Sequence, residues 1–344
     1  MRCRVGQAPA GLQYAPHQPV GYSPLSTSEP CMRAKPPPPN AIDADLPRRA
    51  FLQRAGAGLL GASLLPLAAA DARQTMVKDP ARIGVQLYTV RDAIKADLPG
   101  TLRRIAAMGF EGVETAFWPE GVTLATAARA LREVGLPVSS CHVELPIGDK
   151  RQVMLDTAAA FSCTRMIWHG WPEDSRYSTL DGTKALAAIY NESNRFAKAN
   201  GLQFGIHNHW WEYRNRVGER FVYEVLLEEM EPDIFMEVDT YWVKVAGHAP
   251  SEIVRSLGPR APMLHIKDGP AVFRDNLALD NPDPMTAVGR GTQDFPAIVR
   301  AANGNTEWMI VEMDKTATDV FGALQDSYDY LIRNKLARGR IAAR

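Results

Sequence analysis

The stretch that decides the fold reads NGLQFGIHNHWWE and covers residues 200–212. A glycine ends a helical pattern, a five-residue apolar run follows from Gln203 to His207, and a cluster of His, Asn, Trp and Glu comes directly after it. A short strand behind a glycine-capped helix is typical of a βα unit in a parallel sheet. Polar side chains placed after such a strand are typical of the functional face of an α/β barrel. This stretch therefore predicts both the architecture and the place of its chemistry.

Outward from this stretch, the same unit repeats at intervals of roughly 30 residues. Amphipathic helical patterns fill the intervals between the apolar runs, as in Leu98, Leu102 and Ile105. Eight such units predict a single α/β domain, a (β/α)8 TIM barrel, over residues 82–335. A doubly wound open sheet is the alternative, but no Gly-x-Gly-x-x-Gly follows the first strand. The predicted strands lie at 83–88, 112–115, 138–142, 165–169, 203–207, 234–238, 263–266 and 308–311.

The composition is that of a packed chain without a charge bias. Its 344 residues include 39 Lys+Arg, 39 Asp+Glu and 46% hydrophobic residues. Because the net charge is zero, no basic field attracts phosphate backbones, and a nucleic-acid partner is disfavoured. The 4 cysteines lack the spacing of a zinc site or of a disulfide framework. We expect Cys141 and Cys163 to be free structural thiols.

The chain before the barrel is predicted to be a leader and a targeting segment. Residues 1–45 are rich in proline and predict a disordered leader, within which Met32 is an alternative start. Residues 46–72 combine the pair Arg48-Arg49, a modest apolar stretch and a small-residue cleavage site, and they resemble a twin-arginine (Tat) signal peptide. That stretch is too short for a stable membrane span. We therefore expect the Tat export machinery as a partner and a periplasmic or secreted mature chain.

Polar side chains cluster where the predicted strands end. The catalytic groups of a TIM barrel lie at the carboxyl ends of its strands. All of the 7 histidines except His17 and His248 lie at such ends, which random scatter would not produce. The polar and aromatic residues found there are Gln86, Tyr88, Arg91, Glu114, His142, Glu144, His169, Trp171, His207, Asn208, His209, Trp210, Trp211, Glu212, Asp239, Trp242, His265, Lys267, Asp268, Glu312 and Asp314.

The last four strand ends combine imidazoles with carboxylates. This mixture suits one divalent metal ion such as Mn, Fe, Co or Zn, whereas Mg and Ca prefer oxygen ligands alone. A lone histidine at a strand end is more often a hydrogen-bonded structural residue. Here, however, the donors occupy equivalent positions of consecutive strands and converge on one axis. The predicted ligands are His207 or His209, Asp239, His265 and Glu312.

Five segments in a fixed order resemble the sugar phosphate isomerase/epimerase family, the xylose-isomerase-like barrels. They are 207–212 (HNHWWE), 238–247 (VDTYWVKVAG), 265–268 (HIKD), 288–294 (VGRGTQD) and 311–314 (VEMD). The resemblance implies one divalent metal held at the barrel mouth by four ligands, commonly Glu, Asp, His and Glu. Asp239, His265 and Glu312 match the last three. His207 stands where the family often has Glu and is the favoured first ligand, with His209 as a pocket residue or rival.

The resemblance also implies proton abstraction next to a carbonyl. Ketose 3-epimerases of this family resemble one another in using two metal-bound Glu on opposite faces of the substrate, and His207 in this chain leaves only Glu312 of that pair. We expect a metal ion to polarise the carbonyl and Glu312 to take the proton. A second catalytic group would be Lys267 or His209, with Glu144 and Glu212 as further alternatives. Isomerisation, epimerisation and β-elimination are alternative reactions that each begin with this proton abstraction.

The walls of the predicted site suggest a carbohydrate. Six of the seven Trp lie near strand ends, and aromatic faces stack on sugar rings. No Gly-rich phosphate loop is evident, although Lys267, Arg274 and Arg290 are available for an anion. Since an exported enzyme meets few phosphorylated metabolites, we expect an unphosphorylated sugar or keto-sugar. The candidate substrate-binding residues are Gln86, His142, His169, Asn208, Trp211, Glu212 and Trp242.

Three other functions compete with the isomerase or epimerase. One is β-elimination or hydrolysis of a keto-glycoside on the same site. Another is a non-catalytic periplasmic sugar-binding protein, which would bind sugar without a metal. A metal-dependent hydrolase or nuclease is the third, but nuclease relatives carry more ligands for a three-metal cluster, and the neutral charge disfavours DNA. The sequence indicates neither the sugar, nor the metal, nor an oligomeric state.

Overall fold

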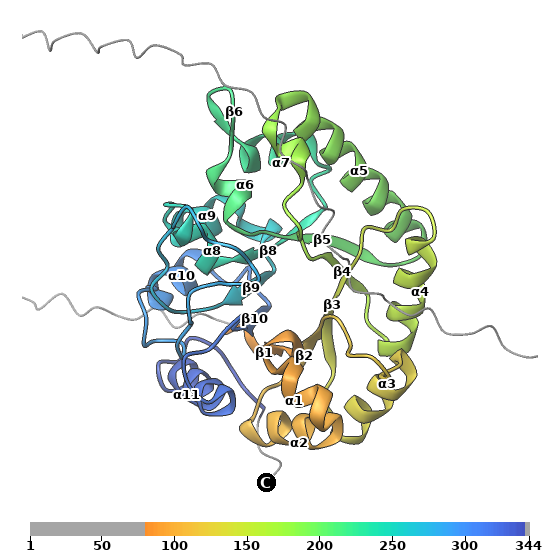
Figure 1. The fold of residues 1–344 in the computed structure, drawn as a ribbon, viewed down its shortest axis with the longest axis vertical. Coiled ribbons are helices and arrows are strands. Elements are labelled where there is room, and N and C mark those ends of the chain that lie inside the picture. Colours follow the sequence, from red (N-terminus) through yellow and green to blue (C-terminus); the bar gives the residue numbers. More distant parts are fainter. Residues whose placement is uncertain (1–79, 341–344) are drawn as a thin grey trace, which may run out of the picture. The chain divides into compact units, whose positions relative to one another are not determined.

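A computed structural model describes residues 80–340 of the chain. The predicted leader and the Tat signal lie outside these residues. Eight parallel strands form a closed barrel in the order β1-β10-β9-β8-β5-β4-β3-β2 (Figure 1). The predicted TIM barrel is therefore confirmed, and each strand lies within one or two residues of its predicted place. The strands are β1 (Arg82–Gln86), β2 (Gly112–Thr115), β3 (Val138–Val143), β4 (Arg165–Trp168), β5 (Gln203–His207), β8 (Phe235–Asp239), β9 (Met263–Ile266) and β10 (Trp308–Val311).

Helices surround the barrel and pack their apolar faces on the strands (Figure 1). Several begin at a side chain that accepts a hydrogen bond from a first-turn amide, among them Thr123, Thr179, Asp294 and Asp319. The helices are α1 (Arg91–Ala96), α2 (Leu98–Met108), α3 (Leu124–Glu133), α4 (Lys150–Phe161), α5 (Leu180–Ala199), α6 (Trp210–Arg214), α7 (Val222–Glu229), α8 (Thr240–Val245), α9 (Pro250–Leu257), α10 (Phe295–Ala302) and α11 (Val320–Arg333). Short 3-10 helices are η1 (Leu87–Val90), η2 (Ser175–Ser178) and η3 (Gly258–Arg260).

The barrel interior has an apolar floor beneath polar side chains. The floor is a separate buried cluster of Ile167, Phe235, Met263, Trp308 and Ile310. Room for these large side chains comes from glycine, because a Cβ on Gly205 would lie 2.3 Å from the Phe235 ring. Side chains two positions further along a strand face the same interior. On β8 and β9 those positions hold Glu237, Asp239 and His265. The same strands therefore provide both the apolar floor and the polar side chains above it.

Three smaller features complete the described part of the chain. A two-stranded antiparallel hairpin, β6 (Arg216–Val217) and β7 (Arg220–Phe221), follows α6 and was not predicted. Cys141 and Cys163 are both buried free thiols, as expected. Among residues 80–340, no helix combines the length and apolar character needed to cross a bilayer.

Candidate metal centre and active site

The last four barrel strands bring His207, Asp239, His265 and Glu312 together, and we call these four residues the upper group. His207 Nε2 lies 3.1 Å from His265 Nδ1 and 3.4 Å from Asp239 Oδ2. Glu312 Oε2 lies 2.8 Å from the same His265 Nδ1. One donor atom from each residue lies within 4.8 Å of all the others, and all four residues are buried. The structure therefore juxtaposes the four predicted ligands.

Asp239 is oriented by backbone amides and by Asn208. The amides of Tyr241 and Trp242, at the start of α8, donate to Asp239 Oδ1 over 2.9 and 3.0 Å. The Asn208 side chain accepts from the Asp239 amide over 3.0 Å and donates to the Asp239 carbonyl over 3.3 Å. Asp239 Oδ2 has no hydrogen-bond partner among the described residues and faces the upper group. Asn208 therefore positions Asp239, because its side-chain amide forms hydrogen bonds with the Asp239 backbone and is not free to bind a ligand.

The Lys267 ammonium lies against the same carboxylates. Its Nζ is 3.0 Å from Asp239 Oδ2, 2.8 Å from Glu312 Oε2 and 2.8 Å from Asp314 Oδ2. Burial would lower the pKa of Lys267, but these three carboxylates outweigh it and hold the pKa well above the usual range. Burial raises the pKa of Asp314 to about 6 despite the nearby ammonium. Lys267 is thus a buried cation within the site.

His209 lies beside His207, outside the upper group. Its ring stacks on Trp211 with a centroid separation of 4.4 Å and contacts the edge of the His207 ring at 5.0 Å. Burial, with the neighbouring positive charges, holds the pKa of both His207 and His209 well below the ordinary value, so both rings are neutral. His209 Nδ1 has no partner among the described residues. The geometry places His207 among the donors and leaves His209 as the rival beside it.

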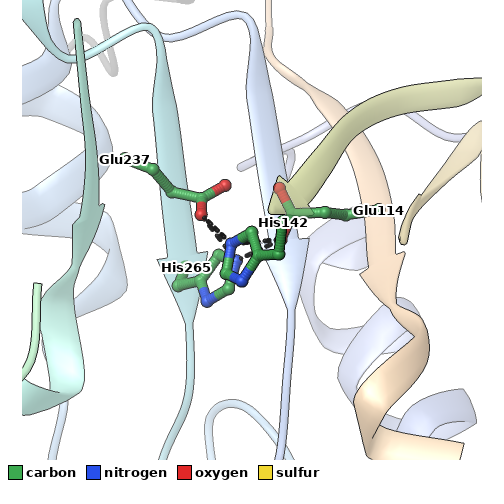
Figure 2. A group of neighbouring side chains, drawn as sticks. All are labelled: Glu114, His142, Glu237 and His265. Atoms are coloured by element: carbon green, nitrogen blue, oxygen red, sulfur yellow. Dashed lines mark hydrogen bonds and ion pairs between the residues drawn. The ribbon is translucent and has the colours of Figure 1, made fainter. Parts of the chain in front are cut away.

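A second cluster of titratable side chains lies on the other side of His265, and we call it the deep group. It contains Glu114 of β2, His142 of β3, Glu237 of β8 and His265 itself (Figure 2). His142 Nε2 lies 2.7 Å from Glu237 Oε2, and His265 Nε2 lies 2.7 Å from Glu114 Oε1. Although burial would lower it, the two carboxylates raise the pKa of His142 to about 9. Burial raises the pKa of Glu237, and so does the neighbouring Glu114.

Glu237 is not among the residues predicted from the sequence. The signal was present, because Glu237 precedes Asp239 by two positions in the strand FMEVD and alternation places both on the interior face. A buried glutamate inside an otherwise apolar run lowers the stability of the fold unless other side chains pair with its carboxylate. Its presence therefore indicates a specific polar contact inside the barrel. Its partners are His265 of the next barrel strand, β9, and His142 of β3, which lies 95 positions away in the chain.

The predicted substrate-binding residues have different contacts in the structure, and several of them bind other side chains or the backbone. Gln86 donates to Glu114 Oε1 over 2.9 Å, and His142 belongs to the deep group, so both serve the barrel interior. Glu212 accepts a hydrogen bond from the His209 amide over 2.9 Å, and burial raises its pKa to about 8. His169 Nε2 lies 3.4 Å from Glu144 Oε1.

Aromatic side chains line one flank of the upper group. Trp211 packs on His209, and the Trp242 ring lies under the Lys267 ammonium at 5.4 Å. The indole nitrogen of Trp242 is buried and has no partner among the described residues. Trp171, by contrast, is 48% exposed. Trp242 therefore offers an unsatisfied N–H donor on this flank, whereas a hydrogen bond from the Trp211 side chain acts to lower the pKa of Glu212.

Asp268, next to Lys267, organises the loop that follows β9. Its carboxylate accepts backbone hydrogen bonds of 2.8 to 3.1 Å from Gly289, Gly291, Thr292 and Gln293. A Cβ on Gly291 would lie 2.1 Å from Asp268 Oδ1, so only glycine lets the loop close around this carboxylate. The HIKD and VGRGTQD segments are therefore one structural unit, and Asp268 supports the site without belonging to it.

Comparison with known proteins agrees with this geometry. The family model of the xylose isomerase-like TIM barrel matches residues 102–333. The chain belongs to this family. No curated protein matches it.

Several solved structures share the fold of this xylose isomerase-like barrel. A sugar phosphate isomerase/epimerase from Parabacteroides distasonis is 22% identical, with a TM-score of 0.62, and the match covers 75% of this chain and 100% of that chain. L-ribulose 3-epimerase is 18% identical, with a TM-score of 0.54 and coverage of 74% and 94%. The 3-keto-D-glucoside 4-epimerase from E. coli is 17% identical, with a TM-score of 0.51 and coverage of 74% and 99%. At these identities the likeness shows the fold.

The donor set of the upper group fits a divalent cation. His207 is neutral and carries a lone pair. Asp239 Oδ2 is a buried carboxylate oxygen that has no hydrogen bond among the described residues and lies 3.0 Å from the Lys267 ammonium. Burial would raise the pKa of Glu312, but the positive charges of Lys267 and His265 outweigh it and hold the pKa well below the usual range. Two imidazoles with two carboxylates suit Mn, Fe, Co or Zn. Binding through His265 Nδ1 requires this nitrogen to be free of its proton.

Proposed function

We propose that this barrel is a metal-dependent sugar isomerase or epimerase that removes a proton next to a carbonyl of an unphosphorylated sugar or keto-sugar. The single observation that carries the proposal is the convergence of the upper group, His207, Asp239, His265 and Glu312, at the carboxyl ends of four neighbouring strands. Active sites of TIM barrels lie at this end. The named activities of the structural neighbours point in the same direction.

A divalent cation in the upper group would polarise the substrate carbonyl and stabilise the negative charge that develops beside it. Glu312 is the proposed base. It is ionised, buried and aimed into the group through Oε2, which the structure places 2.8 Å from both His265 and Lys267. Proton abstraction requires an ionised carboxylate, and a pKa held this low also makes Glu312 a weaker base than a free carboxylate.

Lys267 is proposed to stabilise the charge that develops beside Glu312, and His209 is proposed to carry the second proton transfer. Lys267 is a permanent cation that contacts Glu312, so it can stabilise the base and donate a hydrogen bond to a developing oxyanion. His209 is a neutral ring with a free Nδ1, a state suited to accept or return a proton. Trp211 holds the His209 ring in its orientation by stacking.

The absence of a phosphate from the proposed substrate rests on charge pairing. The three cationic side chains that were candidates for binding a substrate phosphate are each paired with a carboxylate. Lys267 pairs with Asp239, Glu312 and Asp314, Arg274 with Asp283, and Arg290 with Asp326. A phosphate would have to displace one of these partners. A neutral sugar needs only hydrogen bonds and stacking faces, and Trp211 and Trp242 supply both kinds of group.

The proposal is tested by hydrogen exchange between substrate and solvent. The chain is stripped with EDTA, reloaded with Mn²⁺, Co²⁺ or Zn²⁺, and incubated in D₂O with ketoses and 3-keto-glucosides while NMR follows deuterium at the carbons next to the carbonyl. We expect exchange in the reloaded protein and its loss in EDTA and in Glu312→Gln. Glu307→Gln, a control just before β10, should keep the exchange.

The alternatives give different results in the same experiment. Loss of the aglycone from a keto-glycoside, with an unsaturated sugar as product, would assign β-elimination to the site. Sugar binding that persists in EDTA without any exchange would show a binding protein and overturn the enzyme.

We further propose that the mature chain is exported through the Tat pathway and acts in the periplasm or outside the cell. The proposal rests on Arg48-Arg49 and the residues after them, so it is tested in cells rather than on the barrel. Arg48-Arg49→Lys-Lys should leave precursor in the cytoplasm. Export that continues with the double substitution would refute it.

A further inference from the structure

We propose that the deep group, Glu114, His142, Glu237 and His265, is a second binding site for a divalent transition-metal ion. The group lies inside the barrel, with donors from β2, β3, β8 and β9, and three of its residues play no part in the upper group (Figure 2). The inference does not depend on the proposed sugar chemistry, because it concerns which atoms bind an ion.

Nitrogen and oxygen atoms alternate around the deep group. His142 Nε2 lies 2.7 Å from Glu237 Oε2 and 3.1 Å from Glu114 Oε1. His265 Nε2 lies 3.2 Å from Glu237 Oε2 and 2.7 Å from Glu114 Oε1. Ligands about 2.0–2.1 Å from a tetrahedral ion are about 3.3 Å apart. These four separations are therefore only slightly shorter than the ligand separations of an occupied coordination shell, and all four donor atoms lie within 4.8 Å of one another. Two imidazoles and two carboxylates are the donors that Zn, Co, Mn and Fe accept.

The carboxylates of the deep group are supported as metal ligands usually are. Gln86 donates to Glu114 Oε1 over 2.9 Å, and Ser140 Oγ donates to Glu114 Oε2 over 2.5 Å, which fixes the orientation of this carboxylate. Outer hydrogen bonds of this kind orient ligands around metal ions. Glu237 is fully buried, and its Oε1 has no hydrogen-bond partner among the described residues. Buried carboxylate oxygens are rarely left in that state, whereas Oε2 is the Glu237 oxygen that contacts His142 and His265.

Charge balance favours a dication in this place. Glu114 and Glu237 are both 0% exposed and bring two negative charges into the barrel. Isolated buried carboxylates are strongly destabilised, so they require equal positive charge nearby. One divalent ion at the deep group provides that charge. The ion would additionally engage all four donors at once.

The deep and upper groups share the His265 ring but no donor atom. His265 turns Nδ1 toward His207 and Glu312 and turns Nε2 toward Glu114 and Glu237. The two sites are therefore compatible, with the ring between them as an imidazolate bridge once both ring protons have left. The competing explanation for Glu114 and Glu237 is that they only orient His265 through hydrogen bonds.

The test counts ions with Co²⁺ as the probe. The EDTA-stripped chain is titrated by calorimetry, and metal content at saturation is measured by mass spectrometry after gel filtration. We expect two Co²⁺ per chain for the wild type and one for Glu237→Gln and for His142→Gln, with the visible absorption of four-coordinate Co²⁺ decreasing in both. Asp239→Asn should also retain one ion, held by the deep group. His248→Gln, a histidine outside both groups, is the control and should bind two.

The outcomes separate the explanations. If Glu114 and Glu237 only orient His265, Glu237→Gln weakens the upper ion about 10- to 100-fold but leaves the saturating stoichiometry of the wild type. A wild-type chain with a single ion that Asp239→Asn removes and Glu237→Gln retains would overturn the inference. A single ion lost in Glu237→Gln and retained in Asp239→Asn would support the deep site and contradict the upper one.

Discussion

Replacing Lys267 with Met tests how the barrel manages its buried charge. The Lys267 side chain is 1% exposed and contacts three carboxylates, those of Asp239, Glu312 and Asp314. Met keeps most of the volume and removes the ammonium, so the carboxylates lose their shared cation. Removing one partner from a buried ion network costs about 3–5 kcal/mol. For a domain of this size, about 2–4 °C of melting temperature are lost per kcal/mol, so Lys267→Met should melt roughly 6–20 °C below the wild type in EDTA.

The same substitution should strengthen metal binding. The ammonium lies within 3.0 Å of Asp239 Oδ2 and Glu312 Oε2, the two oxygens that the upper group offers to a cation. A divalent ion and Lys267 therefore compete for these atoms. We expect the gap in melting temperature between variant and wild type to narrow as Zn²⁺ is added, since a ligand that binds the native state more tightly stabilises it more.

The assay is thermal unfolding followed by circular dichroism, in EDTA and across a Zn²⁺ titration. Lys184→Met is the matched control, because Lys184 is an exposed lysine paired with Glu229, and such pairs contribute little. It should melt close to the wild type in both conditions. An equal melting temperature for Lys267→Met and wild type in EDTA, or a gap that widens with Zn²⁺, would refute the reasoning.

Three further predictions follow from the site. Glu312→Gln keeps the side-chain size and one oxygen donor but loses the basic carboxylate, so solvent exchange of the substrate should fall at least about 100-fold while metal content by mass spectrometry falls less. Of His207→Ala and His209→Ala, only the first should lose the upper ion; the reverse order would make His209 the ligand. Gly291→Ala forces a Cβ against Asp268 and should lower the free energy of unfolding in urea by about 1–3 kcal/mol, and an unchanged midpoint would show that the loop can shift.

The barrel could be predicted from the sequence because its signals are local. Each strand is a short apolar run, and alternation with period 2 decides which side chains face inward. The upper group was predictable for the same reason, since His207, Asp239, His265 and Glu312 all stand at or beside strand ends, where a closed barrel brings them together. His207 lies in one group with the other three donors, and its role as the metal ligand in place of His209 stays a prediction.

The features of the site that could not be predicted from the sequence depend on contacts between segments that are distant in the chain. Glu237 becomes a donor only because His142 and Glu114 face it across the barrel, 95 and 123 positions away in the chain. Asn208 looked like a pocket residue, yet it is occupied with the backbone of Asp239, which only the register of β5 beside β8 determines. The short hairpin β6–β7 has two-residue strands, too short for any periodicity to appear in the sequence.

Anomalous X-ray diffraction from crystals of the chain loaded with Mn²⁺ or Zn²⁺ shows directly whether the upper group binds a metal ion. We expect an anomalous peak at the barrel mouth, about 2.0–2.2 Å from His207 Nε2, Asp239 Oδ2, His265 Nδ1 and Glu312 Oε2. In such crystals the Lys267 ammonium should have moved from Asp239 toward Asp314, which already lies 2.8 Å away. Fully loaded crystals in which this position stays empty and Lys267 keeps its three carboxylates would contradict the claim.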